Sequence, residues 1–123
     1  MIKQELDESD ILLETIIEGI EEVKGKDITI LDLKNIETAV CKYFVICSGT
    51  SNTHVSSVSD NVRKFVAKEM QEKPWNTEGQ STSEWILLDY SDIVVHVFQE
   101  KTRAFYTLED LWGDAEIRNI ENI

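Results

Sequence analysis

The 123 residues suit one domain with a single modest core, and 41% hydrophobic residues is a composition typical of folded rather than disordered chains. Twelve basic and 24 acidic residues give a net charge of −12, which argues against direct binding to nucleic acid or to anionic membranes. The same charge is compatible with electrostatic steering toward a basic protein partner, and also with a role in solubility alone.

The cysteines and the N-terminus bear on the cellular compartment. Cys41 and Cys47 neighbour apolar residues and belong to no CxxC motif or Cys/His cluster, which favours reduced thiols over a disulfide or a metal site. No apolar run is long enough to cross a bilayer. The first ten residues, MIKQELDESD, are acidic where a targeting peptide would be basic. We therefore expect a cytoplasmic protein.

The first half of the chain predicts two helices and two strands. Apolar residues at helical spacing indicate a helix over about residues 9–24, with the serine at its start as the N-cap. Residues 27–33 are β-branched and predict a strand. Residues 43–47 form a nearly continuous apolar run, which is typical of a strand buried on both faces. A turn at 48–52 then leads into a long helix over about 52–70.

The second half predicts a β-hairpin followed by a helix. Residues 75–78 indicate a short edge strand. The runs 85–90 and 93–98 are apolar strands joined by the turn residues 91 and 92. From residue 102 to residue 112 the apolar period becomes that of a helix.

The order of these elements predicts a fold class. Residues 113–123 form a polar tail that we expect to be frayed or to add a last turn of helix. The order α-β-β-α-β-β-β-α predicts an α/β or α+β domain over residues 1–123, with two layers in which helices flank a mixed central sheet.

Large aromatic side chains among acidic ones give the clearest functional signal. Trp85 follows a polar loop, Tyr90 ends a strand at the turn, and Tyr106 lies off the apolar stripe of its helix. With neighbouring acids such as Asp89 and Asp92, they suggest a surface that binds a basic partner. Each aromatic anchor at such an interface contributes about 2 kcal/mol to the binding free energy. The alternative is that the three aromatics pack in the core with only their polar tips exposed.

An enzyme is the competing hypothesis. The turn at 48–52 follows a buried strand and resembles the Gly-Ser turn of nucleotidyltransferases, with Asp89, Asp92 and His96 as possible chemical groups. Such enzymes need a pair of carboxylates shortly after the turn, whereas here the next acid, Asp60, is alone within the helix. The sequence therefore favours a helix-capping turn and a structural histidine, and predicts no catalysis, no cofactor and no metal.

Two segments carry a resemblance to a known family. They are residues 85–98 (WILLDYSDIVVHVF) and residues 44–51 (FVICSGTS). The matching positions continue at His54, Val55, Arg103, Phe105, Tyr106, Leu108, Glu109, Leu111 and Trp112. Together these segments resemble the ribosomal silencing factor family, also called RsfS or Iojap-like proteins, over nearly the whole chain.

The resemblance implies a nucleotidyltransferase-like fold without that activity. It implies a factor that binds large-subunit ribosomal protein fourteen, blocks joining of the small subunit and lowers translation when nutrients are scarce. It also implies a homodimer away from the ribosome and little direct contact with nucleic acid. The partner-facing residues would be Trp85, Tyr90 and Tyr106, and less strongly Leu88, Asp89 and Asp92. At one position, Ser91, the family usually has glycine, so we expect a strained or different turn there.

Overall fold

The computed structural model describes residues 7–120, apart from the side chains of Phe105 and Tyr106. The helices are α1 (Glu8–Glu22), α2 (Asn52–Met70), α3 (Glu100–Tyr106) and the 3-10 helix η1 (Leu108–Trp112). The strands are β1 (Lys26–Asp32), β2 (Tyr43–Gly49), β3 (Asn76–Glu78), β4 (Trp85–Asp89), β5 (Ile93–Gln99) and β6 (Glu116–Asn119).

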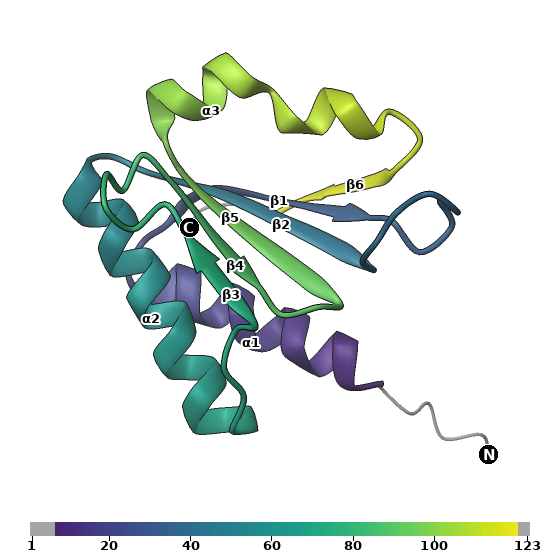
Figure 1. The fold of residues 1–123 in the computed structure, drawn as a ribbon, viewed down its shortest axis with the longest axis horizontal. Helices are drawn as coiled ribbons and strands as arrows, with labels where there is room; N and C mark the ends of the chain where they lie inside the picture. Colours follow the sequence, from purple (N-terminus) through teal and green to yellow (C-terminus); the bar gives the residue numbers. More distant parts are fainter. Residues whose placement is uncertain (1–6, 121–123) are drawn as a thin grey trace.

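All six strands form one sheet in the order β3-β4-β5-β2-β1-β6 (Figure 1). The central strands β2 and β5 are parallel, and every other neighbouring pair is antiparallel. The prediction of a mixed sheet flanked by helices is confirmed. The central position of β2 explains why its sequence is apolar at successive residues, since both of its faces are covered.

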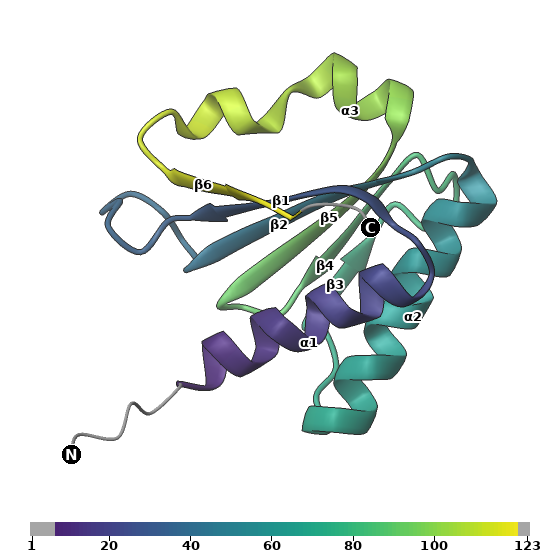
Figure 2. The same cartoon turned by 180° about the vertical axis from the view of Figure 1, so that it is seen from behind.

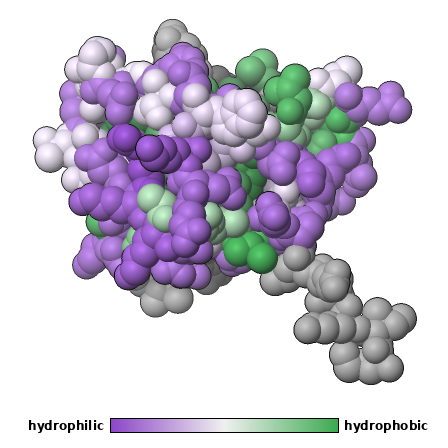
Figure 3. Space-filling model, turned by 60° about the horizontal axis from the view of Figure 1, so that its bottom comes forward, coloured by the Kyte–Doolittle hydropathy of each residue, from purple (hydrophilic) through white to green (hydrophobic). Residues whose placement is uncertain are grey.

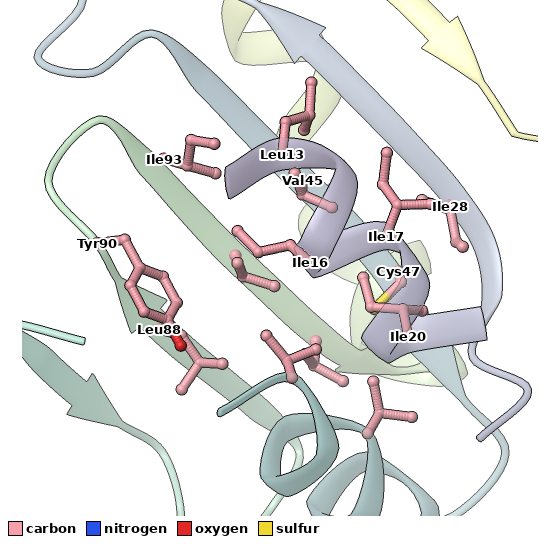
Figure 4. Close-up of a cluster of buried hydrophobic side chains, with 14 of the residues drawn as sticks. Leu13, Ile16, Ile17, Ile20, Ile28, Val45, Cys47, Leu88, Tyr90 and Ile93 are labelled. Carbon is pink, nitrogen blue, oxygen red and sulfur yellow. The ribbon is translucent and has the colours of Figure 1, made fainter. Parts of the chain in front are cut away.

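The helices lie on both faces of the sheet. The long helices α1 and α2 pack on one face, and α3 with η1 passes over part of the other (Figures 1 and 2). The main core lies between the long helices and the sheet, and Figure 4 shows its α1 side chains against those of the strands. A second core, on the other face, consists of Leu31, Leu33, Ile46, Phe98 and Leu108. The outer surface on the side of α1 and α2 is mostly hydrophilic (Figure 3).

The N-terminal helix begins earlier than its sequence predicts. Asp7, not Ser9, is the N-cap, because the Asp7 carboxylate accepts a hydrogen bond from the Asp10 amide at 2.9 Å. Aspartate caps a helix about as well as serine does, so residue type alone does not distinguish Asp7 from Ser9 as the N-cap. Ser9 lies inside the first turn, where its hydroxyl donates to the Asp92 carboxylate at 2.8 Å.

The C-terminal part differs more from the prediction. The single helix expected over 102–112 is broken at Thr107, which has a left-handed φ of 39°. The polar tail, expected to be frayed or helical, contains β6, which pairs antiparallel with β1 from Thr29 to Asp32. Every residue of β6 is exposed, so no apolar alternation in the sequence marks it as a strand.

Candidate functional site

The sheet face opposite α1 and α2 carries partly exposed apolar side chains. Along β4, Trp85, Leu87 and Asp89 are half-buried, whereas Ile86 and Leu88 are buried in the main core. This alternation follows from the pleat, which sends successive side chains to opposite faces. The three half-buried residues therefore lie on the face that the long helices leave uncovered.

Neighbouring strands extend this surface. In β5, Val94 is paired with Asp89 and His96 is paired with Leu87. In β2, the ring of Phe44 meets that of His96 edge-on, with centroids 4.8 Å apart. Trp112 of η1 meets the same phenylalanine edge-on at 5.9 Å. We call this cluster the aromatic face and define it as Phe44, Trp85, Leu87, Val94, His96 and Trp112, of which His96 is buried and the others are half-buried.

Trp85 is held in place by two neighbours on β5. Its indole stacks on Phe98, directly across the strand pair, with ring centroids 4.7 Å apart and planes 28° from parallel. The indole N–H donates to Nδ1 of His96 at 3.1 Å. The backbone is also confined, because a Cβ on Gly79 would lie 1.9 Å from the Trp85 carbonyl oxygen. The Trp85 ring is therefore held by a stacking contact and a hydrogen bond, and its backbone by the close approach of Gly79.

Carboxylates border the aromatic face. Glu78 is exposed and lies across the strand pair from Leu87, which places both on the same side of the sheet. Asp89 lies on that side too, and Glu84, just before β4, is exposed. Apolar and aromatic groups edged by acids provide a contact area for a partner with apolar and basic side chains.

Two of the predicted contact residues are not accessible. Leu88 is 0% exposed and Tyr90 is 4% exposed, and both belong to the main core (Figure 4). Burial raises the pKa of Tyr90 to about 12, and its hydroxyl has no hydrogen-bond partner within the part of the chain that the structure describes. The expected exposure of these two side chains was wrong. Leu87 occupies the surface position that the prediction gave to Leu88.

The other predicted residues have different placements. Asp89 borders the aromatic face, and its carboxylate accepts a hydrogen bond from the Ser91 amide at 2.8 Å. Asp92 is exposed but faces the start of α1, where it bonds Ser9 and lies 3.9 Å from the Lys42 ammonium. Tyr106 ends α3, and its side chain lies outside the described part of the molecule. Of the predicted site residues, Trp85 and Asp89 therefore share one face of the sheet, at opposite ends of β4.

Strand alternation was the signal that would have identified the face. Counting every second residue from Trp85 gives Leu87 and Asp89, and the same count in β5 gives Val94 and His96. The sequence-based interpretation applied this count to His96 in the second strand, but it selected the contact residues of the first strand by their type. Phe44 and Trp112 were harder to find, because their proximity depends on the parallel pairing of β2 with β5 and on the path of η1.

The turn before α2 is accounted for by helix capping. The Thr50 amide donates to Nδ1 of His54 at 3.0 Å, and the His54 amide donates to the Ser51 hydroxyl at 3.1 Å. A Cβ on Gly49 would lie 2.9 Å from the Val55 nitrogen, so the glycine is needed for close packing of the turn. These contacts explain the residue types of the turn without a bound phosphate.

The cysteines lie in surroundings that suppress thiolate formation. Burial raises the pKa of the Cys41 thiol to about 11 and that of Cys47 to about 12, and neither forms a disulfide. Within residues 7–120, no three His, Cys, Asp or Glu side chains gather as a possible metal site, and no helix is long and apolar enough to cross a membrane. Among the described residues, the aromatic face is therefore the candidate functional site.

These features define a small α+β domain with one covered sheet face and one aromatic, acid-bordered face. The chain belongs to the family described as ribosomal silencing factor during starvation, RsfS, whose family model matches residues 6–123. Members of this family are ribosome-associated regulatory factors.

Individual relatives agree with this assignment. The chain is 34% identical to ribosomal silencing factor RsfS of Halalkalibacterium halodurans over 112 residues, which cover 91% of this chain and 94% of that protein. It is 34% identical to the Bacillus subtilis protein of the same name over 89% of this chain and 92% of that one. A crystal structure of a Chromobacterium violaceum protein is similar, with a TM-score of 0.81, 32% identity and coverage of 87% of this chain and 88% of that one.

Proposed function

We propose that the chain acts in the cytoplasm by binding the large ribosomal subunit through ribosomal protein fourteen. The bound domain would occupy the surface that the small subunit needs, and so lower translation when nutrients are scarce. Membership of the silencing factor family supports a ribosomal role, and the aromatic face is the observation that supports a protein partner.

The composition of the face fits a basic protein better than RNA. Trp85, Leu87 and Val94 supply apolar contact area, and Glu78 and Asp89 are positioned to pair with lysine or arginine. With a net charge of −12, the chain as a whole repels a phosphate backbone. The inhibition proposed is steric, so it requires no catalytic group.

The predicted homodimer is compatible with the same surface. A partly exposed aromatic face is a suitable contact for a second copy when no ribosome is present, since burying it removes apolar area from water. Subunit binding and self-association would then compete for Trp85 and Leu87.

Co-sedimentation with purified large subunits, followed by addition of small subunits, tests the proposal. We expect the protein to sediment with the large subunit and to reduce formation of the joined particle. Trp85→Ala is expected to weaken binding about 30-fold or more, as is typical of a buried aromatic anchor. A folded wild-type protein that does not bind would refute the proposal.

Trp75→Ala is the matched control. Trp75 is 83% exposed and lies just before β3 at the edge of the sheet, outside the aromatic face. We expect this variant to bind like the wild type. If Trp75→Ala and Trp85→Ala lost equal affinity for the large subunit, the aromatic face would not be the specific contact surface.

A further inference from the structure

His96 is a buried polar side chain whose role the proposed function leaves open. Its side chain is 4% exposed and lies between Trp85, Phe44 and Phe98. Among the described residues, the one hydrogen bond of this side chain is the one that Nδ1 accepts from the Trp85 indole, and the buried Nε2 has no partner there. A buried polar group among aromatic rings is costly, so its contact with the indole requires an explanation.

We infer that His96 is a positioning residue, which fixes the orientation of the Trp85 indole and withdraws the indole N–H from the partner. This inference rests on the proposed function, because it names what the partner meets at Trp85. The histidine is placed for this role by the strand pairing, since it lies two residues before Phe98, the residue directly opposite Trp85.

The protonation state of the histidine agrees with this role. Burial lowers the pKa of His96 to about 4, so the ring is neutral near pH 7. A neutral imidazole has one acceptor and one donor nitrogen, and an acceptor at Nδ1 places the proton on Nε2. The lone pair of Nδ1 is therefore available to the indole throughout the physiological range.

The consequence concerns the chemistry of the partner. A tryptophan at an interface commonly offers its N–H as a donor. Here that donor is satisfied within the chain, so what the half-buried Trp85 offers to a partner is an apolar surface and not its N–H group. Such a surface fits the aliphatic stem of a lysine or arginine, whose charged end can reach Glu78 or Asp89. We therefore expect a cationic or aliphatic side chain opposite Trp85, and no hydrogen-bond acceptor for the indole.

Indole hydrogen exchange, measured by NMR, tests the positioning role without any partner. The three tryptophans, Trp75, Trp85 and Trp112, give three indole N–H signals, and a Trp85→Phe sample assigns the relevant one. We expect slow exchange at Trp85 in the wild type and exchange at least about tenfold faster in His96→Phe, which keeps a ring but removes the acceptor. His96→Asn, whose side-chain oxygen can replace Nδ1, should restore protection. Equal protection in wild type and His96→Phe would overturn the inference.

Binding to purified large subunits tests the consequence for the partner. His96→Phe should weaken binding about tenfold, because the indole is no longer pre-oriented, and His96→Asn should recover most of it. Val95→Ala is the stability control, since Val95 is 0% exposed and lies in the main core on the opposite face. It should lower the unfolding midpoint without changing affinity. If Val95→Ala weakened binding as much as His96→Phe, the role of His96 would be structural only.

A double variant tests the claim about the indole N–H. Trp85→Phe combined with His96→Phe removes donor and acceptor together and leaves two apolar rings, so it should bind better than His96→Phe alone. A loss as large as that of Trp85→Ala would show that the partner needs the N–H, and would overturn the claim. Wild-type protein that fails to bind large subunits would refute the proposed function, whereas the exchange experiment would still decide the role of His96.

Discussion

The turn between β4 and β5 places a serine in a backbone conformation that favours glycine. Ser91 has a φ of 76°, and the Asp92 amide donates to the Tyr90 carbonyl at 3.0 Å. This hydrogen bond, between residues two apart, closes a γ-turn centred on Ser91, which is a strained arrangement for a residue with a Cβ. The expectation of a strained turn at this position is confirmed.

Ser91→Gly is therefore expected to stabilise the protein. Relief of the left-handed conformation contributes about 1 kcal/mol, partly offset by the greater freedom of glycine in the unfolded chain. Urea unfolding monitored by circular dichroism would measure the gain. Ser91→Ala keeps the Cβ and should show no gain, and a lower unfolding free energy for Ser91→Gly would contradict this account.

His96 makes stability depend on pH. Its pKa is lowered to about 4 in the folded protein from 6.5, so the unfolded chain binds more protons between these two values. The free energy of unfolding should therefore fall as the pH drops from 6.5 toward 4, by at most about 3 kcal/mol.

Urea unfolding at several pH values between 7 and 4.5 would measure this decline. Carboxylates titrate at the lower end of the range, so the informative quantity is the difference between wild type and His96→Phe. The variant should show a flatter profile. Parallel profiles for the two proteins would show that His96 is not the group responsible.

At the scale of elements, one arginine joins the C-terminal segment to the sheet. The Arg103 guanidinium donates to the Asp27 carbonyl at 2.5 Å and to the Ser48 hydroxyl at 3.0 Å. Its other nitrogen donates to the Thr29 hydroxyl and to the Glu109 carboxylate, each at 3.0 Å. The side chain is 14% exposed, so α3, η1, β1 and β2 are connected through a mostly buried charge.

Arg103→Met should destabilise the protein by about 3 kcal/mol, because it leaves the Glu109 carboxylate and two hydroxyls without this donor. Arg103→Lys keeps the charge but not the planar fork, and should recover only part of the loss. Arg63→Met is the control, since its ion pair with Asp60 is 3.6 Å long and largely exposed, and should cost under about 0.5 kcal/mol. Equal losses at Arg103 and Arg63 would contradict the role given to Arg103.

Elements with a clear apolar period were predictable from the sequence, and polar or broken ones were not. The spacing of α2 predicts a buried stripe, and its valines Val55, Val58, Val62 and Val66 are fully buried, whereas Phe65 and Met70 of the same stripe are only half-buried. β6 was missed because its pairing depends on β1, a strand about 85 residues earlier, and not on its own composition. The same holds for the candidate site. Trp85 was predictable from its residue type, whereas its contact with His96 depends on the register of β4 and β5.

For the whole molecule, charge should govern the rate of encounter. A net charge of −12 attracts a basic protein over distances that salt screens, with a Debye length of about 10 Å at 0.1 M. Association with the proposed partner, isolated ribosomal protein fourteen, followed by stopped-flow fluorescence, should slow about tenfold between 0.05 and 0.5 M salt. Dissociation should change less. An association rate independent of salt would contradict steering.

The place of β6 in the sheet has a consequence for synthesis of the chain. Strand β1 ends at Asp32, and its outer neighbour, β6, begins only at Glu116. The central parallel pair likewise joins β2 to β5, with α2 and the β3–β4 segment between them. Distant pairings of this kind form slowly, since a long loop must close first. While a nascent chain is being made, the outer edge of β1 therefore has no partner strand until β6 has left the exit tunnel, and a product truncated before β6 would present that edge to other unfolded chains.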